Sequence, residues 1–254
     1  MAYASSSVHI GCAFSIIEIL LVLYRDYLRY PDNNLQSISR DYLILSKGHG
    51  VMAQYACMHQ LGWLPTSALN NYFKDGTDLK GLSDSRIDGL EVTSGSLGHG
   101  LSVGVGLALG AKLTKSAQKV YAIVGDGEMN EGPIWEGMLF ASHHKLSNFM
   151  MIVDANGQQA MGKTSDILNL ESLGNKIQSF GFDILEVDGH NESNLSVAIS
   201  KLWNMGSDSP KAIVAKTVKG KGVSFMEDNN EWHYTRLTED SYSDALKELM
   251  NLKK

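Results

Sequence analysis

The chain has 254 residues, 43% of them apolar, which is enough for a substantial core in one large α/β domain or in two small ones. We expect a single domain over residues 1–254. A formal net charge of −6 gives no general reason to expect nucleic acid or an anionic membrane as a partner. The two cysteines, Cys12 and Cys57, lack the number and spacing of a disulfide framework or a zinc site, which is typical of a reducing compartment.

The first apolar segment, residues 14–24, is too short to span a bilayer and carries Glu18. No basic leader precedes it and no small-residue cleavage site follows it, so it does not resemble a signal peptide. We therefore expect a buried helix in a cytoplasmic protein.

Further along the chain, short apolar runs that end in polar or glycine-containing turns alternate with longer helical patterns. The predicted strands are 42–45, 120–124, 149–153, 184–187 and 212–215, and the predicted helices are 51–61, 101–113, 133–145, 192–204 and 239–250. This alternation favours an α/β fold in which a parallel sheet has helices on both faces, giving three layers. Ligands bind such sheets at the carboxyl ends of the strands, so the turns that follow the strands are the place to look for a site.

The turns after two consecutive strands carry oxygen ligands. The strand at 120–124 is followed by GDGEMNEG, in which Gly125 and Gly127 leave room for a ligand beside Asp126. The next strand ends in DANGQQ, and Asn156 follows Asp126 by about thirty residues, the length of one strand-helix-strand unit. Each turn alone is typical of an ordinary strand-to-helix junction. Together, a carboxylate and an amide at neighbouring strand ends indicate a Mg²⁺-diphosphate site.

The segment GDGEMNEGPIWEGMLFASHHKLSNFMMIVDANGQQ closely resembles the thiamine-diphosphate motif of transketolases. VHIG, LSKGHG, GLEVTSGSLGHGLS and KTVKGKG also resemble transketolase segments and occur in the same order, so the resemblance covers nearly the whole chain. It implies the thiamine-diphosphate-binding fold, with thiamine diphosphate and Mg²⁺ as cofactors. The implied activity is transfer of a two-carbon ketol unit from a ketose or its phosphate to an aldose acceptor.

The resemblance also implies roles for individual residues. Asp126, Asn156 and the main-chain carbonyl of Gln158 would hold the metal. Gly127 would approach the diphosphate, while Gly95, Ser96 and Leu97 would line the pocket for the thiazolium and aminopyrimidine rings. His9, His49 and His233 match histidines that contact substrate or cofactor, so we expect all three to be catalytic and His49 and His233 to bind cofactor as well.

Other charged groups are ambiguous. His99 is expected at most to support the cofactor segment indirectly, and no role is expected for His143 or His144. Glu131 and Glu136 match glutamates near the subunit interface of transketolases, where they communicate between paired cofactors. They are also well placed as helix-start carboxylates favoured by the helix dipole, and both interpretations can hold together.

One position departs from the family pattern. Transketolases usually carry a histidine in a GHP-like sequence about a dozen residues before the glycine-rich pocket segment, whereas this chain reads KGLSDSRIDGLEVTSG and has Leu82 there. The family's histidine contacts a hydroxyl of the donor. A less hydroxylated donor, such as a 2-oxo acid, and compensation by another histidine such as His99 are the two hypotheses that follow.

A complete transketolase continues with a pyrimidine-binding domain, which supplies the glutamate that activates the cofactor, and with a third domain. Here residues 241–254 resemble an amphipathic finishing helix with lysines at its end. A truncated gene would explain the short chain, but we favour a second subunit that carries the pyrimidine-binding domain, in a dimer of heterodimers. Most of the helix that transketolases place before the His9 motif is also missing, as in a trimmed chain or one with a misassigned start. A catalytically idle regulatory subunit is the remaining alternative.

Overall fold

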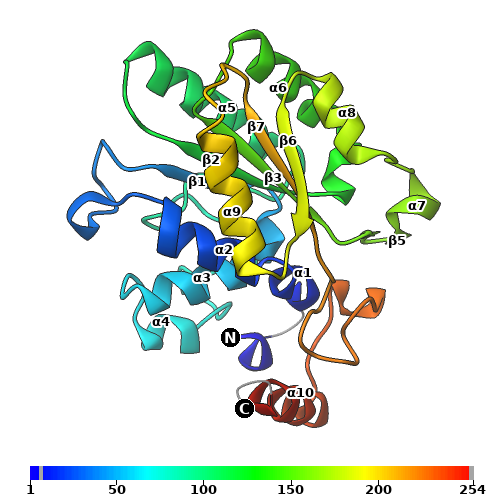
Figure 1. Cartoon of the computed structure of the whole chain (residues 1–254). Helices are drawn as coiled ribbons and strands as arrows, with labels where there is room; N and C mark the ends of the chain where they lie inside the picture. The colour runs from blue at the N-terminus through cyan, green and yellow to red at the C-terminus, as the bar shows by residue number, and fades with distance from the viewer. Residues whose placement is uncertain (6–7, 252–254) are drawn as a thin grey trace.

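The computed structural model describes residues 1–5 and 8–251 and has a five-stranded parallel sheet at its centre (Figure 1). The strands are β1 (Tyr42–Leu45), β2 (Val120–Gly125), β3 (Phe149–Ala155), β6 (Asp183–Asp188) and β7 (Lys211–Lys216), in the order β1-β2-β3-β7-β6. All five predicted strands are confirmed, each to within two residues at either end.

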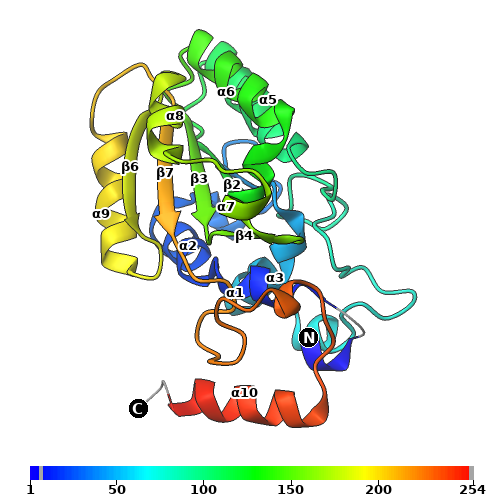
Figure 2. The same cartoon turned by 90° about the vertical axis from the view of Figure 1, so that its right-hand side faces the viewer.

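Helices cover both faces of this sheet, which confirms the three-layer α/β prediction. One face packs against α5 (His99–Leu113), α6 (Gly132–His143) and α8 (Leu173–Ser179), and the other against α2 (Ile17–Val22), α3 (Val51–Gln60) and α9 (Glu192–Trp203). Figure 2 shows α9 on one side of the strands and α5 and α6 on the other. The strands read as continuous apolar runs because alternate residues enter the two cores: Tyr121 and Ile123 join one, and Ala122 and Val124 the other.

The long predicted helices are confirmed as α3, α5, α6, α9 and α10 (Glu239–Asn251); the last three residues of the expected finishing helix lie outside the described residues. Several short elements were not predicted. They are α1 (Ile10–Phe14), α4 (Thr66–Asn70), α7 (Thr164–Ile167), α8 and a hairpin of β4 (Gln158–Gln159) with β5 (Gly162–Lys163). Each is too short to give a clear hydrophobic period.

The helix predicted over residues 14–24 is mostly buried but is not continuous. The chain turns at Ser15, α2 starts at Ile17, and a π-helical turn follows at Leu23–Tyr27. The turn brings the Ser15 hydroxyl to within 2.7 Å of an Asp154 carboxylate oxygen at the end of β3, where it donates a hydrogen bond. Among the described residues, no helix is both long and apolar enough to cross a membrane.

Segments near the two ends of the chain meet at the carboxyl edge of the sheet. Val8 and Thr235 form an isolated antiparallel bridge, with a hydrogen bond of 2.9 Å from the Val8 N–H to the Thr235 carbonyl. This bridge sets the segment that starts at His9 beside the loop that follows β7. Residues from both ends of the sequence therefore face the turns after β2 and β3.

Candidate active site

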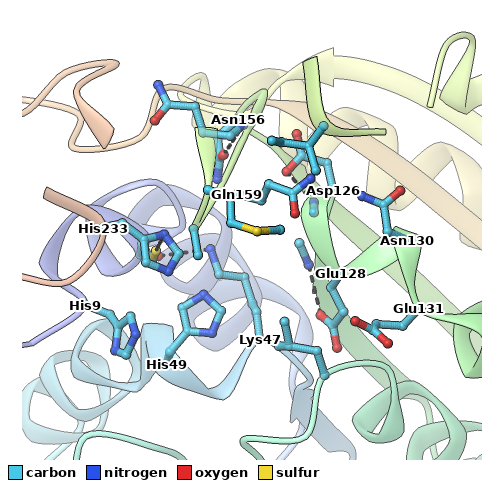
Figure 3. A pocket seen from close by; sticks show the side chains of 18 of the residues that line it. His9, Lys47, His49, Asp126, Glu128, Asn130, Glu131, Asn156, Gln159 and His233 are labelled. Carbon is cyan, nitrogen blue, oxygen red and sulfur yellow. Dashed lines mark hydrogen bonds between the residues drawn. The ribbon is translucent and has the colours of Figure 1, made fainter. Parts of the chain in front are cut away.

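A cavity of about 610 Å³ opens at the carboxyl ends of β2 and β3 (Figure 3). Its volume lies within the usual range for small-molecule and cofactor sites. The predicted site residues that line it are His9, His49, Gly95, Leu97, Asp126, Gly127, Asn156, Gln158 and His233. The structure thus brings together nearly all of the predicted set, and Figure 3 shows the three histidines toward one end and Asp126 toward the other.

The two predicted side-chain metal ligands lie at adjacent strand ends, as their spacing suggested. Gly125 and Asp154 are partners in the β2–β3 register, so Asp126 and Asn156 each follow closely after a paired position. One Asp126 oxygen accepts the Gly157 N–H at 2.6 Å and the other accepts the Gly127 N–H at 2.8 Å. The Asn156 amide oxygen accepts the Gln158 N–H at 3.0 Å. The turn is thus folded tightly around these oxygens.

The chemistry of this end of the cavity fits a hard cation. Burial, followed by the neighbouring Asp154 carboxylate, raises the pKa of Asp126 to about 7, and together they outweigh two backbone hydrogen bonds and the Lys47 charge. Within residues 1–5 and 8–251 there is no cluster of three or more His, Cys, Asp or Glu able to hold a metal. A set of one carboxylate, one amide and one carbonyl, completed by ligand phosphates, matches the coordination that Mg²⁺ prefers.

Further polar atoms of the cavity wall lack protein partners. The side-chain oxygens of Asn130 and Gln158 and the side-chain nitrogen of Gln159 are buried without a hydrogen bond. Such groups are costly unless something satisfies them. Gly127 leaves space beside them, because a Cβ at that position would stand 2.7 Å from the Gln159 Cβ. This surface is suited to a polar ligand that approaches the backbone closely.

His9, His49 and His233 form a compact group at the other end of the cavity. The ring centroid of His9 lies 5.0 Å from that of His49 and 5.3 Å from that of His233, and the centroids of His49 and His233 are 5.7 Å apart. The three residues come from three distant parts of the sequence, and the fold brings them to one end of the cavity.

These histidines are kept uncharged by their surroundings. Burial, followed by the charges of Lys219 and Lys47, lowers the pKa of His9 to about 4 and that of His233 to about 3. Burial and the Lys47 ammonium lower the pKa of His49 well below its ordinary value. At neutral pH each ring is therefore a neutral imidazole, able to donate one hydrogen bond and accept another.

Two buried lysines for which the sequence predicted no role lie next to this group. Lys47 donates hydrogen bonds to Asp154 and to the Cys12 carbonyl, the latter at 3.1 Å. Lys219 donates to His233 Nδ1 at 2.8 Å. Burial lowers the pKa of Lys219. Burial also acts to lower the pKa of Lys47, but the charges of Asp154, Cys12 and Asp126 and a hydrogen bond to Asp154 together raise it. Both lysines stand inside motifs that resemble transketolase segments, LSKGHG and KTVKGKG, and that was the available signal.

Glu128 is a further residue without a predicted role, although it lies in the GDGEMNEG turn. Its carboxylate accepts hydrogen bonds from the Gly98 N–H at 2.8 Å, from the Gly125 N–H at 3.1 Å and from the Ser46 hydroxyl. The side chain is buried and has three donors, so it joins the turns after β1 and β2 to the start of α5. Glu128 thereby fixes one wall of the cavity.

These observations can be compared with known proteins. The family model described as "Transketolase, thiamine diphosphate binding domain" matches residues 2–252. The chain belongs to this transketolase family. Its fold and its assignment to a transferase family are thereby confirmed.

Two curated transketolase subunits are similar over most of their length. The chain is 34% identical to an apulose-4-phosphate transketolase subunit of Phocaeicola vulgatus, covering 98% of this chain and 88% of that protein. It is 37% identical to 6-deoxy-6-sulfo-D-fructose transketolase subunit SqwG of a Clostridium species, covering 95% and 88%. Both relatives are named as subunits.

Solved transketolases share the fold over nearly all of this chain. The transketolase of Leishmania mexicana aligns with a TM-score of 0.90 at 27% identity, covering 97% of this chain and 38% of that one. The transketolase of Campylobacter jejuni gives 0.90 at 28% identity, covering 96% and 39%. The chain therefore spans less than two fifths of these solved transketolase chains.

The glycine-rich segment predicted to line the transketolase cofactor pocket is only partly in the cavity wall. Gly95 and Leu97 line the cavity, whereas Ser96 is exposed beside it and its hydroxyl lies 3.3 Å from His99 Nδ1. Leu82, at the position of the usual family histidine, does line the cavity and is 39% exposed. A Cβ on Gly95 would be 3.0 Å from Leu82, so the glycine leaves room for the leucine.

The remaining predicted residues lie at the margin of the site. Glu131 lines the cavity just before α6, while Glu136 is exposed on that helix. His99 is exposed at the first residue of α5 and does not line the cavity. His143 and His144 lie at the far end of α6, which agrees with their having no assigned role in the cavity.

Proposed function

We propose that this chain is the diphosphate-binding subunit of a two-subunit transketolase, which transfers a two-carbon ketol unit from a ketose or its phosphate to an aldose. The observation that carries the proposal is the single cavity that joins Asp126 and Asn156 at one end to three neutral histidines at the other. The similarity to proteins named as transketolase subunits supports the division into two chains.

In this proposal Asp126, Asn156 and the Gln158 carbonyl hold Mg²⁺, and the metal leaves positions for the diphosphate. The polar groups of Asn130 and Gln159 gain partners from the ligand. Gly127 would admit the diphosphate close to the backbone, and Gly95, Ser96 and Leu97 would contact the rest of the cofactor. The cost of burying the Asp126 carboxylate is offset once the cation is present.

Thiamine diphosphate supplies the carbanion chemistry of ketol transfer when it is bound. The residues of this chain orient and stabilise. His49 and His233 contact cofactor and substrate, and His9 contacts substrate. As neutral imidazoles, all three can donate a hydrogen bond to an oxygen on which charge develops and can accept a proton from a hydroxyl.

The partner would be a C-terminal subunit with the pyrimidine-binding domain, supplying the glutamate that activates the cofactor. We propose that residues 1–254 form one domain, and that the active complex is a cytoplasmic dimer of heterodimers. Glu131 and Glu136 flank the start of α6, where they are available for contacts between subunits.

A second candidate function rests on Leu82. An apolar side chain in the cavity wall offers no hydrogen bond to a donor hydroxyl, which favours a carboligase that takes its two-carbon unit from a 2-oxo acid. A regulatory subunit without activity is disfavoured, because it would not need Asp126, Asn156 and three neutral histidines around one cavity.

The cofactor site is tested first by calorimetric titration of the chain, in complex with a co-expressed pyrimidine-domain protein, with thiamine diphosphate in the presence and absence of Mg²⁺. We expect binding only with the metal, and a loss of at least about tenfold in affinity for Asp126→Ala. Asp166→Ala, at an exposed carboxylate of α7, is the matched control. Binding that ignores both Mg²⁺ and Asp126 would refute the metal site.

Activity is tested on the complex with a co-expressed pyrimidine-domain protein, using a panel of ketose phosphates and 2-oxo acids as donors. Turnover that needs both chains supports a split transketolase. Reaction with 2-oxo acids alone selects the second candidate. His49→Asn should lower kcat/KM by about 10²-fold, the typical contribution of one positioned donor, while His143→Asn should leave it unchanged.

A further inference from the structure

His190 lies outside the cavity, directly after the edge strand β6, yet it joins two distant segments. Its Nδ1 is 3.0 Å from a carboxylate oxygen of Glu18 on α2, and its Nε2 accepts the Val218 N–H at 2.8 Å. The side chain is only 12% exposed. Because a backbone N–H donates to Nε2, that nitrogen carries no proton, and Nδ1 carries the one donated to Glu18. The contacts thus select one neutral tautomer.

The turn that carries His190 is built against the segment it contacts. The Gly189 N–H donates to the Lys216 carbonyl at 2.8 Å, and the His190 N–H donates to the Asp188 carboxylate at 2.9 Å. A Cβ on Gly189 would stand 2.5 Å from the Thr217 methyl carbon, so only glycine allows this approach. The backbone of this turn therefore fixes the position of the imidazole relative to Val218.

The segment held in this way leads into the site. Thr217 donates its hydroxyl to Asp154, the buried carboxylate that also pairs with Lys47. Lys219 is 1% exposed and donates to His233 Nδ1 at 2.8 Å and to the Asn230 side-chain oxygen at 3.1 Å. Since the ammonium occupies Nδ1 of His233, the proton of that ring sits on Nε2.

We propose that His190 is a positioning residue of the active site, which fixes Val218 and through it holds Lys219 behind His233. Glu18 sets the tautomer that makes this possible. The expected effect on cofactor binding rests on the proposed function, whereas the effect of His190 on Val218 concerns this chain alone. His190 acts on the site by positioning Lys219, which is a different role from a general contribution to the stability of the fold.

The structural part is tested by hydrogen exchange of the Val218 amide in the full chain. His190→Gln keeps one acceptor and one donor, and its exchange should stay within about threefold of wild type. His190→Leu keeps neither, and should speed exchange about tenfold, the effect of losing one hydrogen bond. Glu18→Leu removes the carboxylate that accepts the Nδ1 proton of His190, and it should also speed exchange. This variant replaces His190→Leu if the latter does not fold.

His59→Leu is the matched control, because it removes a histidine that interacts with the Leu64 carbonyl, 2.7 Å away, near the end of α3. It should leave Val218 unchanged. Exchange at Val218 that is the same in wild type, His190→Leu and Glu18→Leu would overturn the inference.

The functional part is tested by the affinity for thiamine diphosphate, with Mg²⁺, of the chain in complex with the co-expressed pyrimidine-domain protein. His190→Leu should weaken binding about tenfold and His190→Gln less than about threefold. In a Lys219→Met background, His190→Leu should add less than about twofold, because both changes act on one contact. A full tenfold loss in that background would show that His190 acts elsewhere. If the wild-type complex binds no thiamine diphosphate, the proposed function fails, while the exchange measurement still decides the role of His190.

Discussion

Lys47 and Asp154 form an ion pair that is almost completely closed from solvent at the floor of the cavity, with side chains 2% and 0% exposed. Burial disfavours both charges, but the Lys47 ammonium and hydrogen bonds from Lys47, Thr217 and Ser15 keep the pKa of Asp154 below its usual value. The pair connects the turn after β1 to the end of β3. It gives the cavity a fixed charge arrangement before any ligand binds.

Lys47→Met should therefore lower the free energy of unfolding by about 3–5 kcal/mol, because it leaves the Asp154 carboxylate buried without a counter-charge. Urea denaturation of the ligand-free chain measures this. Lys247→Met removes an exposed pair with Asp244, whose charged atoms are 2.8 Å apart, and should cost much less, because solvent screens the pair. Equal losses in the two variants would contradict the assignment of Lys47 to a buried pair.

The pH dependence of stability should report the neutral histidines. The pKa of His9, about 4 when folded, lies below the ordinary value of 6.5, so the unfolded chain takes up this proton first. The stability from the neutral ring is complete above pH 6.5 and is lost as the pH falls toward about 4. Asp126 acts oppositely, because its pKa of about 7 makes the folded state take up the proton first.

The comparison is therefore between wild type and His9→Gln, with Asp126 present in both. The variant should lose less stability than wild type between about pH 7 and about pH 5. His233→Gln should behave in the same way, because the pKa of His233 is lowered to about 3. Identical pH profiles for the variants and wild type would mean that these rings are not held neutral.

Gly127→Ala should damage the site through one contact. The added Cβ would stand 2.7 Å from the Gln159 Cβ, so the β4–β5 hairpin must shift, at a cost of about 1–3 kcal/mol in the free energy of unfolding. Gly132→Ala, at the first residue of α6, meets nothing within 4 Å and should stay within about 1 kcal/mol of wild type. Thermal denaturation and thiamine-diphosphate affinity should both single out Gly127→Ala.

Leu82→His should change donor preference in the assembled enzyme. The position lines the cavity and is partly exposed, so a histidine can be accommodated and can donate a hydrogen bond to a donor hydroxyl. One such bond should raise kcat/KM for ketose phosphates relative to 2-oxo acids about tenfold. An unchanged ratio would show that Leu82 does not contact the donor.

Much of the fold was predictable because its signals are local. Strands buried on both faces read as short apolar runs, so β2 and β3 were found almost to the residue. The spacing of Asp126 and Asn156 then placed them at adjacent strand ends, because parallel strands joined by a helix bring their carboxyl ends to one edge. The histidine group came from resemblance, since no local pattern relates residues so far apart.

The parts that were missed depend on contacts between distant segments. At the break, the Ser15 hydroxyl donates to Asp154, and the apolar pattern of residues 14–24 contains no sign of that partner. Ser96 is a different case, because it lies beside the cavity and its contact, with His99, is local, although it stands between two residues of the lining. A charged or polar side chain carries no local mark of which distant group will pair with it.

The bridge between Val8 and Thr235 has a consequence for the order in which the protein becomes functional. Contacts between residues nearly a full chain length apart are slow to form, because a large loop must close before they are made. The strand pairs of the sheet join segments that are closer in sequence than Val8 and Thr235, whereas His9 meets His233 only after segments near both chain ends have joined. Ligand-binding competence should therefore appear late in refolding, after most of the secondary structure is in place.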